Sequence, residues 1–156
     1  PKFIARRVVI HAAEDVGMAD PTALMIAESA ARAVEQSSFP KAKNPLAEAV
    51  IYIATAPKSN SVVSAINNAV NYVENNKAGD VPPHLKDSHY AGASELGHGL
   101  DYKYPHNYSK NYVEQNYLPE DMQDLSFYKP GKMGREKKTA QFLDYLKNDR
   151  SSEGDQ

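Results

Sequence analysis

The distribution of glycine and proline divides the sequence into two parts of different character. Between Lys2 and Asn76 there is one glycine, Gly17, and apolar residues recur at intervals of three and four. This spacing places apolar side chains along one face of an α-helix. The stretch from Gly79 to Gly131 instead holds five glycines and five prolines, which disfavour helix interiors. The pattern predicts helices first and a long irregular segment second.

The first part contains four predicted helices, at about 2–15, 21–36, 45–55 and 60–76. Asp20 and Asn44 each precede a proline, and this pairing of a capping side chain with proline is typical of a helix start. Short joins between the helices favour antiparallel neighbours. In the fourth helix the apolar residues expected to face inward are Val62, Val63, Ile66, Val70 and Val73.

We therefore expect an all-α fold, a helical bundle with an irregular Tyr/Pro/Gly-rich arm at about 79–131. The predicted organisation is a helical domain at 1–130, followed at 131–156 by a terminal helix (about Arg135 to Lys147) and a polar tail. A period-two pattern at 102–108 allows one short strand or hairpin. Because the chain opens at Pro1 on a helical pattern, we also expect it to be part of a longer protein.

Composition limits the chemistry. The chain has no cysteine, which excludes disulfides, thiolate metal sites and cysteine nucleophiles. A net charge of -2 provides no general attraction for nucleic acid, so DNA contact would need a local basic patch. The longest nearly apolar run is too short to cross a membrane, which predicts a soluble protein.

No catalytic or metal motif is present in the sequence. A Walker loop needs glycine before Lys-Ser/Thr, whereas Lys137 precedes Lys138 and Thr139. The histidines His84, His89, His98 and His106 match no compact metal spacing, so we interpret them as structural. His11, on the apolar first helix, is interpreted as a core or interface histidine. We predict no catalytic, cofactor-binding or metal-binding residue.

The stretch from Tyr102 to Pro119 packs five tyrosines into sixteen positions, and a basic run follows it. Exposed rings beside lysines can stack single-stranded bases, whereas buried tyrosines serve as packing material. We favour packing or subunit contact over DNA contact, and both remain open. The residues predicted for such DNA or subunit contact are Lys103, Tyr104, His106, Tyr108, Lys110, Lys129, Lys132, Arg135, Lys137 and Lys138.

Four long stretches together resemble one known family. They are "ARRVVIHAAEDVGMADPTAL", "PLAEAVIYIATAPKSNSVVSAI", "VPPHLKDSHY" and "YKYPHNYSKNYVEQNYLP". In this order and spacing they resemble the C-terminal region of the RarA/MgsA family of AAA+ ATPases, over about Ile4 to Pro130. The part after Gly131 fits the family pattern less well. The resemblance implies a helical domain related to the collar of clamp loaders, which assembles subunits into a homotetramer.

The resemblance also implies a role in replication-fork maintenance and recombination, in the cytoplasm and associated with the nucleoid. ATP and Mg would belong to a preceding ATPase module, because the family's Walker motifs have no counterpart here. The fragment itself would be no enzyme and hold no cofactor. Implied partners are a second copy, DNA through the full-length protein, and single-stranded DNA-binding protein or other replication proteins, with no membrane. The alternative is a single-stranded DNA-binding module that uses the basic tail and the tyrosine-rich arm.

Overall fold

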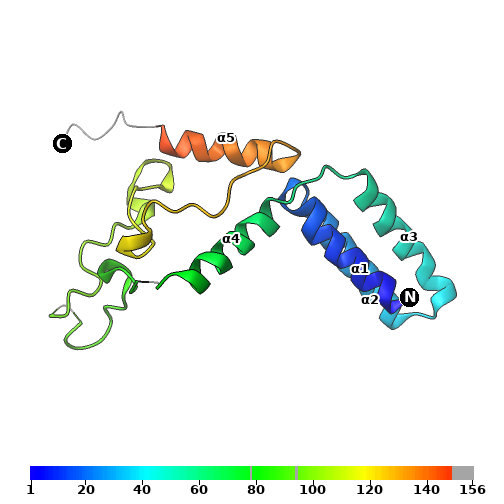
Figure 1. Ribbon diagram of the computed structural model, residues 1–156, viewed down its shortest axis with the longest axis horizontal. Helices are drawn as coiled ribbons and strands as arrows, with labels where there is room; N and C mark the ends of the chain where they lie inside the picture. Colours follow the sequence, from blue (N-terminus) through cyan, green and yellow to red (C-terminus); the bar gives the residue numbers. More distant parts are fainter. Residues whose placement is uncertain (78, 94, 149–156) are drawn as a thin grey trace. The chain divides into compact units, whose positions relative to one another are not determined.

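The computed structural model describes residues 1–77, 79–93 and 95–148, apart from the side chain of Phe39. The described chain is all helical and contains no strand, which confirms the predicted fold class (Figure 1). It divides into two compact units, one of residues 1–69 with the chain from 127 onward and one of residues 70–126. The predicted domain boundary at 130–131 stays a prediction, and the predicted tail beyond Asn148 lies outside the described residues.

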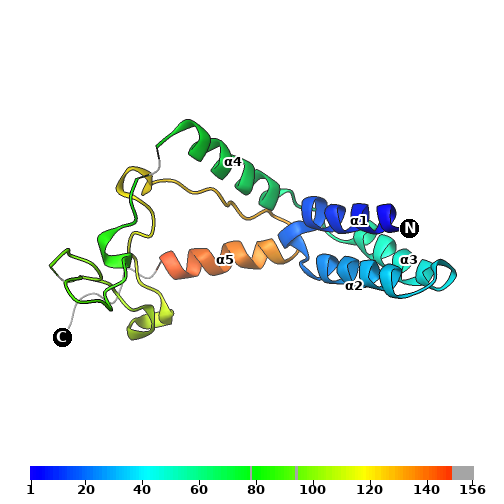
Figure 2. The ribbon, with the colours of Figure 1, turned by 90° about the horizontal axis from the view of Figure 1, so that it is seen from below.

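The first unit is built on three helices, α1 (Lys2–His11), α2 (Thr22–Gln36) and α3 (Phe39–Thr55). They lie side by side in Figures 1 and 2, and α2 packs against both of the others. Their shared core is rich in alanine, and Ala23 and Ala27 of α2 are completely buried. Side chains this small allow the helix backbones to approach closely.

α1 ends in a tight series of turns rather than in one long helix to residue 15. A π-helical turn, Ala12–Val16, and a 3₁₀ turn, Gly17–Ala19, follow it. Gly17 has a φ of 51°, a left-handed value that glycine adopts without steric cost. Asp20 Oδ1 then accepts a hydrogen bond from the Thr22 N–H at 3.1 Å, so the predicted role of Asp20 at the start of α2 is confirmed.

The predicted start of the third helix at residue 45 is wrong, because α3 begins at Phe39 and continues through Pro45. Burial explains the early start. Ala42, Leu46, Ala49 and Ile53 lie on one face and are all buried in the core, which offsets the hydrogen bond that Pro45 cannot donate. Asn44 is therefore inside the helix and is not its cap.

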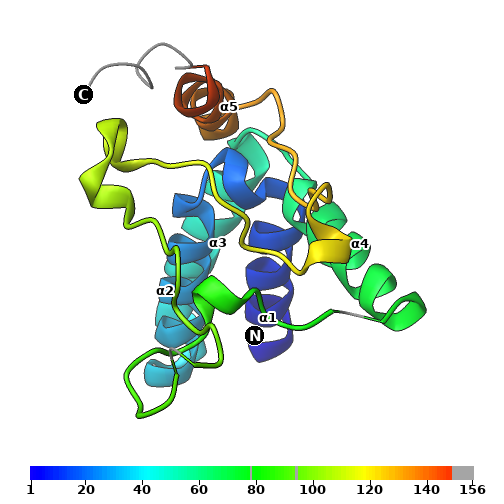
Figure 3. The same cartoon turned by 90° about the vertical axis from the view of Figure 1, so that its left-hand side faces the viewer.

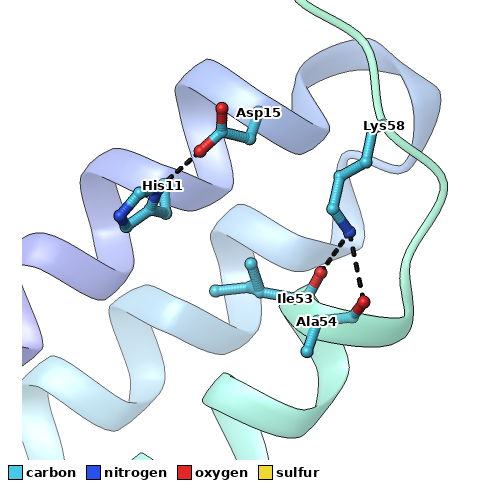
Figure 4. Close-up of polar contacts among 5 residues, drawn as sticks. All are labelled: His11, Asp15, Ile53, Ala54 and Lys58. Carbon is cyan, nitrogen blue, oxygen red and sulfur yellow. Dashed lines mark hydrogen bonds and ion pairs between the residues drawn. The ribbon is translucent and has the colours of Figure 1, made fainter.

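The end of α3 is closed by a lysine. Lys58 Nζ donates to the carbonyl oxygens of Ile53 at 2.5 Å and Ala54 at 3.4 Å (Figure 4). It also donates to the carbonyl oxygen of Ala56 at 2.6 Å. A cation is favourable here because the last carbonyls of a helix have no partner within it. The join also contacts the end of the first helical stretch, because the Ser59 N–H donates to the Asp15 carbonyl at 2.8 Å.

α4 (Ser61–Asn75) begins in the first unit and ends in the second. The Ser61 N–H is 3.3 Å from the Ser59 hydroxyl oxygen, as expected of a side chain that caps the helix start. The last helix, α5 (Arg135–Lys147), lies where the sequence predicts it. No helix among the described residues is long and apolar enough to cross a membrane.

The arm forms most of the second unit, and its described residues are organised only by short 3₁₀ turns (Figure 3). One of these turns, Pro105–Asn107, lies within the region 102–108 where a strand was allowed, and the described chain has no strand there, so that alternative is wrong. Hydrogen bonds from a side chain, rather than backbone pairing between strands, connect this region. Gln115 Nε2 donates to the Lys103 carbonyl at 2.7 Å, and its Oε1 accepts from the Lys103 N–H at 3.2 Å.

Candidate self-association and nucleic-acid contact surfaces

Glu136, in the first turn of α5, is completely buried although it lies in a basic, hydrophilic stretch. Its Oε1 accepts hydrogen bonds from the Ser61 hydroxyl and, at 2.9 Å, from the Tyr128 hydroxyl. Its other oxygen, Oε2, has no hydrogen bond of normal geometry to any described residue. One carboxylate thus joins the start of α4, the segment before α5 and α5 itself.

The environment of Glu136 keeps it ionised. Burial raises the pKa of its carboxyl, but hydroxyl groups of Ser59, Ser61 and Tyr128 and the Gly131 backbone stabilise the charged form. Together they outweigh burial, so the pKa of Glu136 lies below its ordinary value. In return, burial and the neighbouring carboxylate raise the pKa of the Tyr128 hydroxyl. Glu136 therefore carries its negative charge inside the protein, held mainly through Oε1.

Two glycines allow this close packing. A Cβ on Gly131 would lie 2.5 Å from Glu136 Oε2, and one on Gly134 would lie 2.1 Å from the Ala19 carbonyl oxygen. Gly134 also has a φ of 55° at the position before α5. Both positions need glycine because a side chain would collide with groups of the same unit.

The burial of Glu136 leaves the surrounding cations unopposed at the surface. Lys129, Lys132, Arg135, Lys137 and Lys138 are all exposed, and none forms a salt bridge with a described residue. Further along α5, the rings of Phe142 and Tyr145 stack with centroids 6.5 Å apart, and each residue is 57% exposed. This surface combines positive charge with aromatic rings.

The arm exposes most of its tyrosine rings. Tyr102, Tyr104, Tyr108 and Tyr117 are exposed and Tyr112 is half-buried, and packing of these rings onto the helices or against another subunit stays a prediction. A Gly- and Pro-rich chain without helices offers few apolar surfaces for rings to cover; Ala93, Val113 and Met122 are the buried apolar residues among its described positions.

The five predicted contact residues of the arm differ in exposure. Lys103, Tyr104, His106 and Tyr108 are exposed, and the rings of Tyr104 and His106 are 5.0 Å apart. Lys110 is half-buried and has a left-handed φ of 62°. These residues belong to the second unit, whereas the five basic residues near α5 belong to the first.

The histidines of the arm have separate partners. His84 Nε2 donates to the Asn116 carbonyl at 2.7 Å, His89 pairs with Asp87, and His98 contacts the Tyr90 hydroxyl. No group of three or more His, Asp or Glu side chains in the described part of the chain is placed to hold a metal ion.

His11 does not lie in the core, and its alternative placement at an interface stays a prediction. Its side chain is about half exposed, and its Nδ1 lies 2.5 Å from Asp15 Oδ2, one turn along the same helical stretch (Figure 4). The core of α1 is instead filled by Ala5, Val8 and Ala12. The wide apolar arc of this helix led the sequence interpretation to place His11 in the core or at an interface.

α4 carries a row of four exposed apolar side chains. Val62, Ile66, Val70 and Val73 follow one another at steps of four, four and three and so lie on one face. They are 39%, 56%, 46% and 56% exposed. The expectation that these four residues face inward is wrong, because α1, α2 and α3 already close their core with one another, whereas Val63 of the same expectation is half-buried. We call these four residues the α4 stripe.

A hollow of about 800 Å³ in the second unit is the remaining feature of interest. Asp80, Glu120 and Asp121 line it together with Pro82 and Pro83. Asp80 is bound by Lys86 at 2.6 Å, and that contact is the main reason why the pKa of Asp80 is lowered. The hollow shows no arrangement of groups typical of a catalytic site.

Comparison with known proteins gives a consistent result. A family model described as the C-terminal domain of MgsA AAA+ ATPases matches residues 1–147. Replication-associated recombination protein A of Bacillus subtilis is 49% identical over 85% of this chain. An uncharacterized AAA domain-containing protein of Mycobacterium tuberculosis is 46% identical over 94%, and replication-associated recombination protein A of Escherichia coli 33% over 94%. The chain spans about a third of the length of these relatives, at 31%, 32% and 33%.

Proposed function

This chain belongs to the MgsA AAA+ ATPase C-terminal family, and from that premise we propose that it is a self-association domain. It would hold several copies of an ATPase module together, as a homotetramer, in a protein of replication-associated recombination. The observation that carries the proposal is the exposed α4 stripe. The ATP and Mg chemistry would reside in the ATPase module, and this domain would contribute none of it.

The energetics favour association through more than one surface. Full burial of a half-exposed valine or isoleucine contributes roughly 1 kcal/mol. The α4 stripe provides four such side chains per copy, whereas association costs about 4–15 kcal/mol. One contact through α4 is therefore marginal alone. Other exposed apolar side chains, Phe3 of α1, Met25 of α2 and Ile51 of α3, are available for a second contact, as a tetramer with two kinds of interface requires.

A tethering experiment tests the function. The chain is fused at its N-terminus to a monomeric fluorescent protein, and bleaching steps are counted on single particles at a concentration that preserves assembly. A self-association domain gives particles with several reporters, four for the tetramer. Particles that bleach in one step, like the unfused reporter, contradict the proposal.

A second candidate function is contact with single-stranded DNA, and the burial of Glu136 favours it. Because this carboxylate is buried and bonded to Ser61 and Tyr128, it forms no ion pair with the outward cations Lys137 and Lys138. Phosphate contacts from such residues produce strongly salt-dependent binding. The stacked pair of Phe142 and Tyr145 offers rings for bases, worth about 1–3 kcal/mol each.

The DNA candidate is tested by anisotropy of a labelled oligothymidine across salt concentrations. Substitution of Lys137 and Lys138 by glutamine removes two contacts, and the slope of log affinity against log salt decreases by about 1.4. The matched control substitutes Lys41 and Lys43, which are exposed on α3. Equal loss in the control, or no binding by the unmodified chain, contradicts this candidate.

A further inference from the structure

The spacing of the residues in the α4 stripe is nearly the same in both directions along the helix. The steps between its members are four, four and three, so its midpoint falls between Asn67 and Asn68. When two such helices run antiparallel, Val62 of one copy faces Val73 of the other and Ile66 faces Val70. We propose that α4 pairs with α4 of a second copy in this antiparallel arrangement, about a twofold axis that crosses the stripe between Ile66 and Val70. The inference rests on the proposed self-association and names its contact.

The composition of α4 favours a second copy over an unlike partner. Between Ser61 and Asn75 there is a single charged residue, Glu74, and the neighbours of the stripe include Asn67 and Ala69. A twofold contact brings each side chain near its axis against its own copy. An amide can donate to and accept from another amide, whereas a charge would repel its copy. The stripe itself carries no charge that would repel its copy, and the helix offers no charged rim for a partner of opposite charge.

The single charge also selects the direction. In a parallel pair the two Glu74 carboxylates would lie side by side and repel each other. In the antiparallel pair each lies near the first turn of the other α4, where the helix dipole favours a negative group. Antiparallel pairing thus removes a repulsion and adds a favourable interaction. The alanines Ala65 and Ala69 beside the stripe leave room for close approach.

Cysteine cross-linking tests the direction, because the chain has no cysteine of its own. In the antiparallel pair, the two copies of residue 62 are about 17 Å apart along the axis, at 1.5 Å per residue. A disulfide needs Cα atoms about 4.4–6.8 Å apart. The V62C/V73C double variant should oxidise to a covalent dimer, whereas V62C alone and V73C alone should not. A covalent dimer of either single variant overturns the proposal.

A charge placed in the stripe tests the surface itself. Ile66→Glu puts one carboxylate of each copy against Val70 of the other copy. This buried charge should weaken the pair and reduce the average mass of the protein in solution. The matched control, Asn68→Glu, adds the same charge away from the stripe on the same exposed helix and should leave the mass unchanged. Circular dichroism checks that both variants keep the helical content of the unmodified chain.

The outcomes separate this inference from the function on which it rests. If the unmodified chain associates but the double variant does not cross-link, or Ile66→Glu keeps the full mass, the α4 pair is overturned and self-association stands. If the unmodified chain is monomeric at tens of micromolar, both are overturned. Covalent dimers of the double variant alone, together with a reduced mass of Ile66→Glu alone, support the α4 pair.

Discussion

Replacing Tyr128 by phenylalanine removes one hydrogen bond from the buried carboxylate of Glu136 and keeps the aromatic ring. The Tyr128 hydroxyl donates to Oε1 at 2.9 Å, and the carboxylate is completely buried. A hydrogen bond to a charged group contributes about 1.5–3 kcal/mol to stability. We therefore expect Tyr128→Phe to lower the free energy of unfolding by about 2 kcal/mol at neutral pH.

Urea denaturation followed by circular dichroism measures this loss. With a slope of about 1–3 kcal/mol per molar urea, the midpoint should fall by roughly 1 M. Protein concentration is held constant, because self-association would itself change apparent stability. Tyr104→Phe is the matched control, since this tyrosine is exposed on the arm, and its midpoint should remain within error of the unmodified chain.

The pH dependence has a definite sign. The pKa of Glu136 is below its ordinary value in the folded protein, because its hydrogen bonds outweigh the effect of burial. Its stabilising contribution is therefore present above the ordinary pKa and is lost as pH falls through the folded value. The difference between Tyr128→Phe and the unmodified chain should shrink in that range. If the free energies of unfolding of the two proteins differ by less than about 0.5 kcal/mol at neutral pH, the role assigned to Glu136 is refuted. A difference that does not change in acid refutes it as well.

Two further predictions concern positions that hold the first unit together. Asp20→Ala removes the carboxylate that accepts hydrogen bonds from the Thr22 N–H at the start of α2 and, at 2.7 Å, from the Tyr52 hydroxyl. The free energy of unfolding, measured in urea, should fall by about 1–2 kcal/mol. The Tyr52 hydroxyl is the main reason why the pKa of Asp20 is lowered, so this loss should diminish as pH falls below its ordinary pKa; a loss that grows in acid contradicts the assignment. Gly134→Ala should destabilise more than Gly92→Ala, because both have positive φ but only the Cβ at 134 meets a backbone oxygen. The Gly92 change should cost about 1–2 kcal/mol, and equal effects would show that the contact with Ala19 is unimportant.

The sequence was sufficient for the helices whose ends are marked by local chemistry. Asp20 identifies the start of α2, and Ser59 the start of α4, since capping depends on neighbours along the chain. The start of α3 could not be found this way, because the burial of Ala42 by other helices outweighs the preference of Pro45 for a helix start. Tertiary burial decides in such a case, and no local pattern reveals it.

The candidate surfaces were predictable only in part. Helical periodicity identifies which residues of α4 share a face, but it cannot say whether that face meets the same chain or another. The scarcity of charge on α4 was a signal that could have marked the stripe as a contact surface. Glu136 gave no such signal, because its partner Ser61 is 75 positions away and a glutamate among lysines is typical of a solvated surface.

Sedimentation equilibrium of the 156-residue chain at tens of micromolar tests self-association most directly. The chain mass is 17.2 kDa. A mass that rises with concentration toward four times this value is the predicted result, and Ile66→Glu should lower it at every concentration. A mass that stays at one chain throughout would contradict the account.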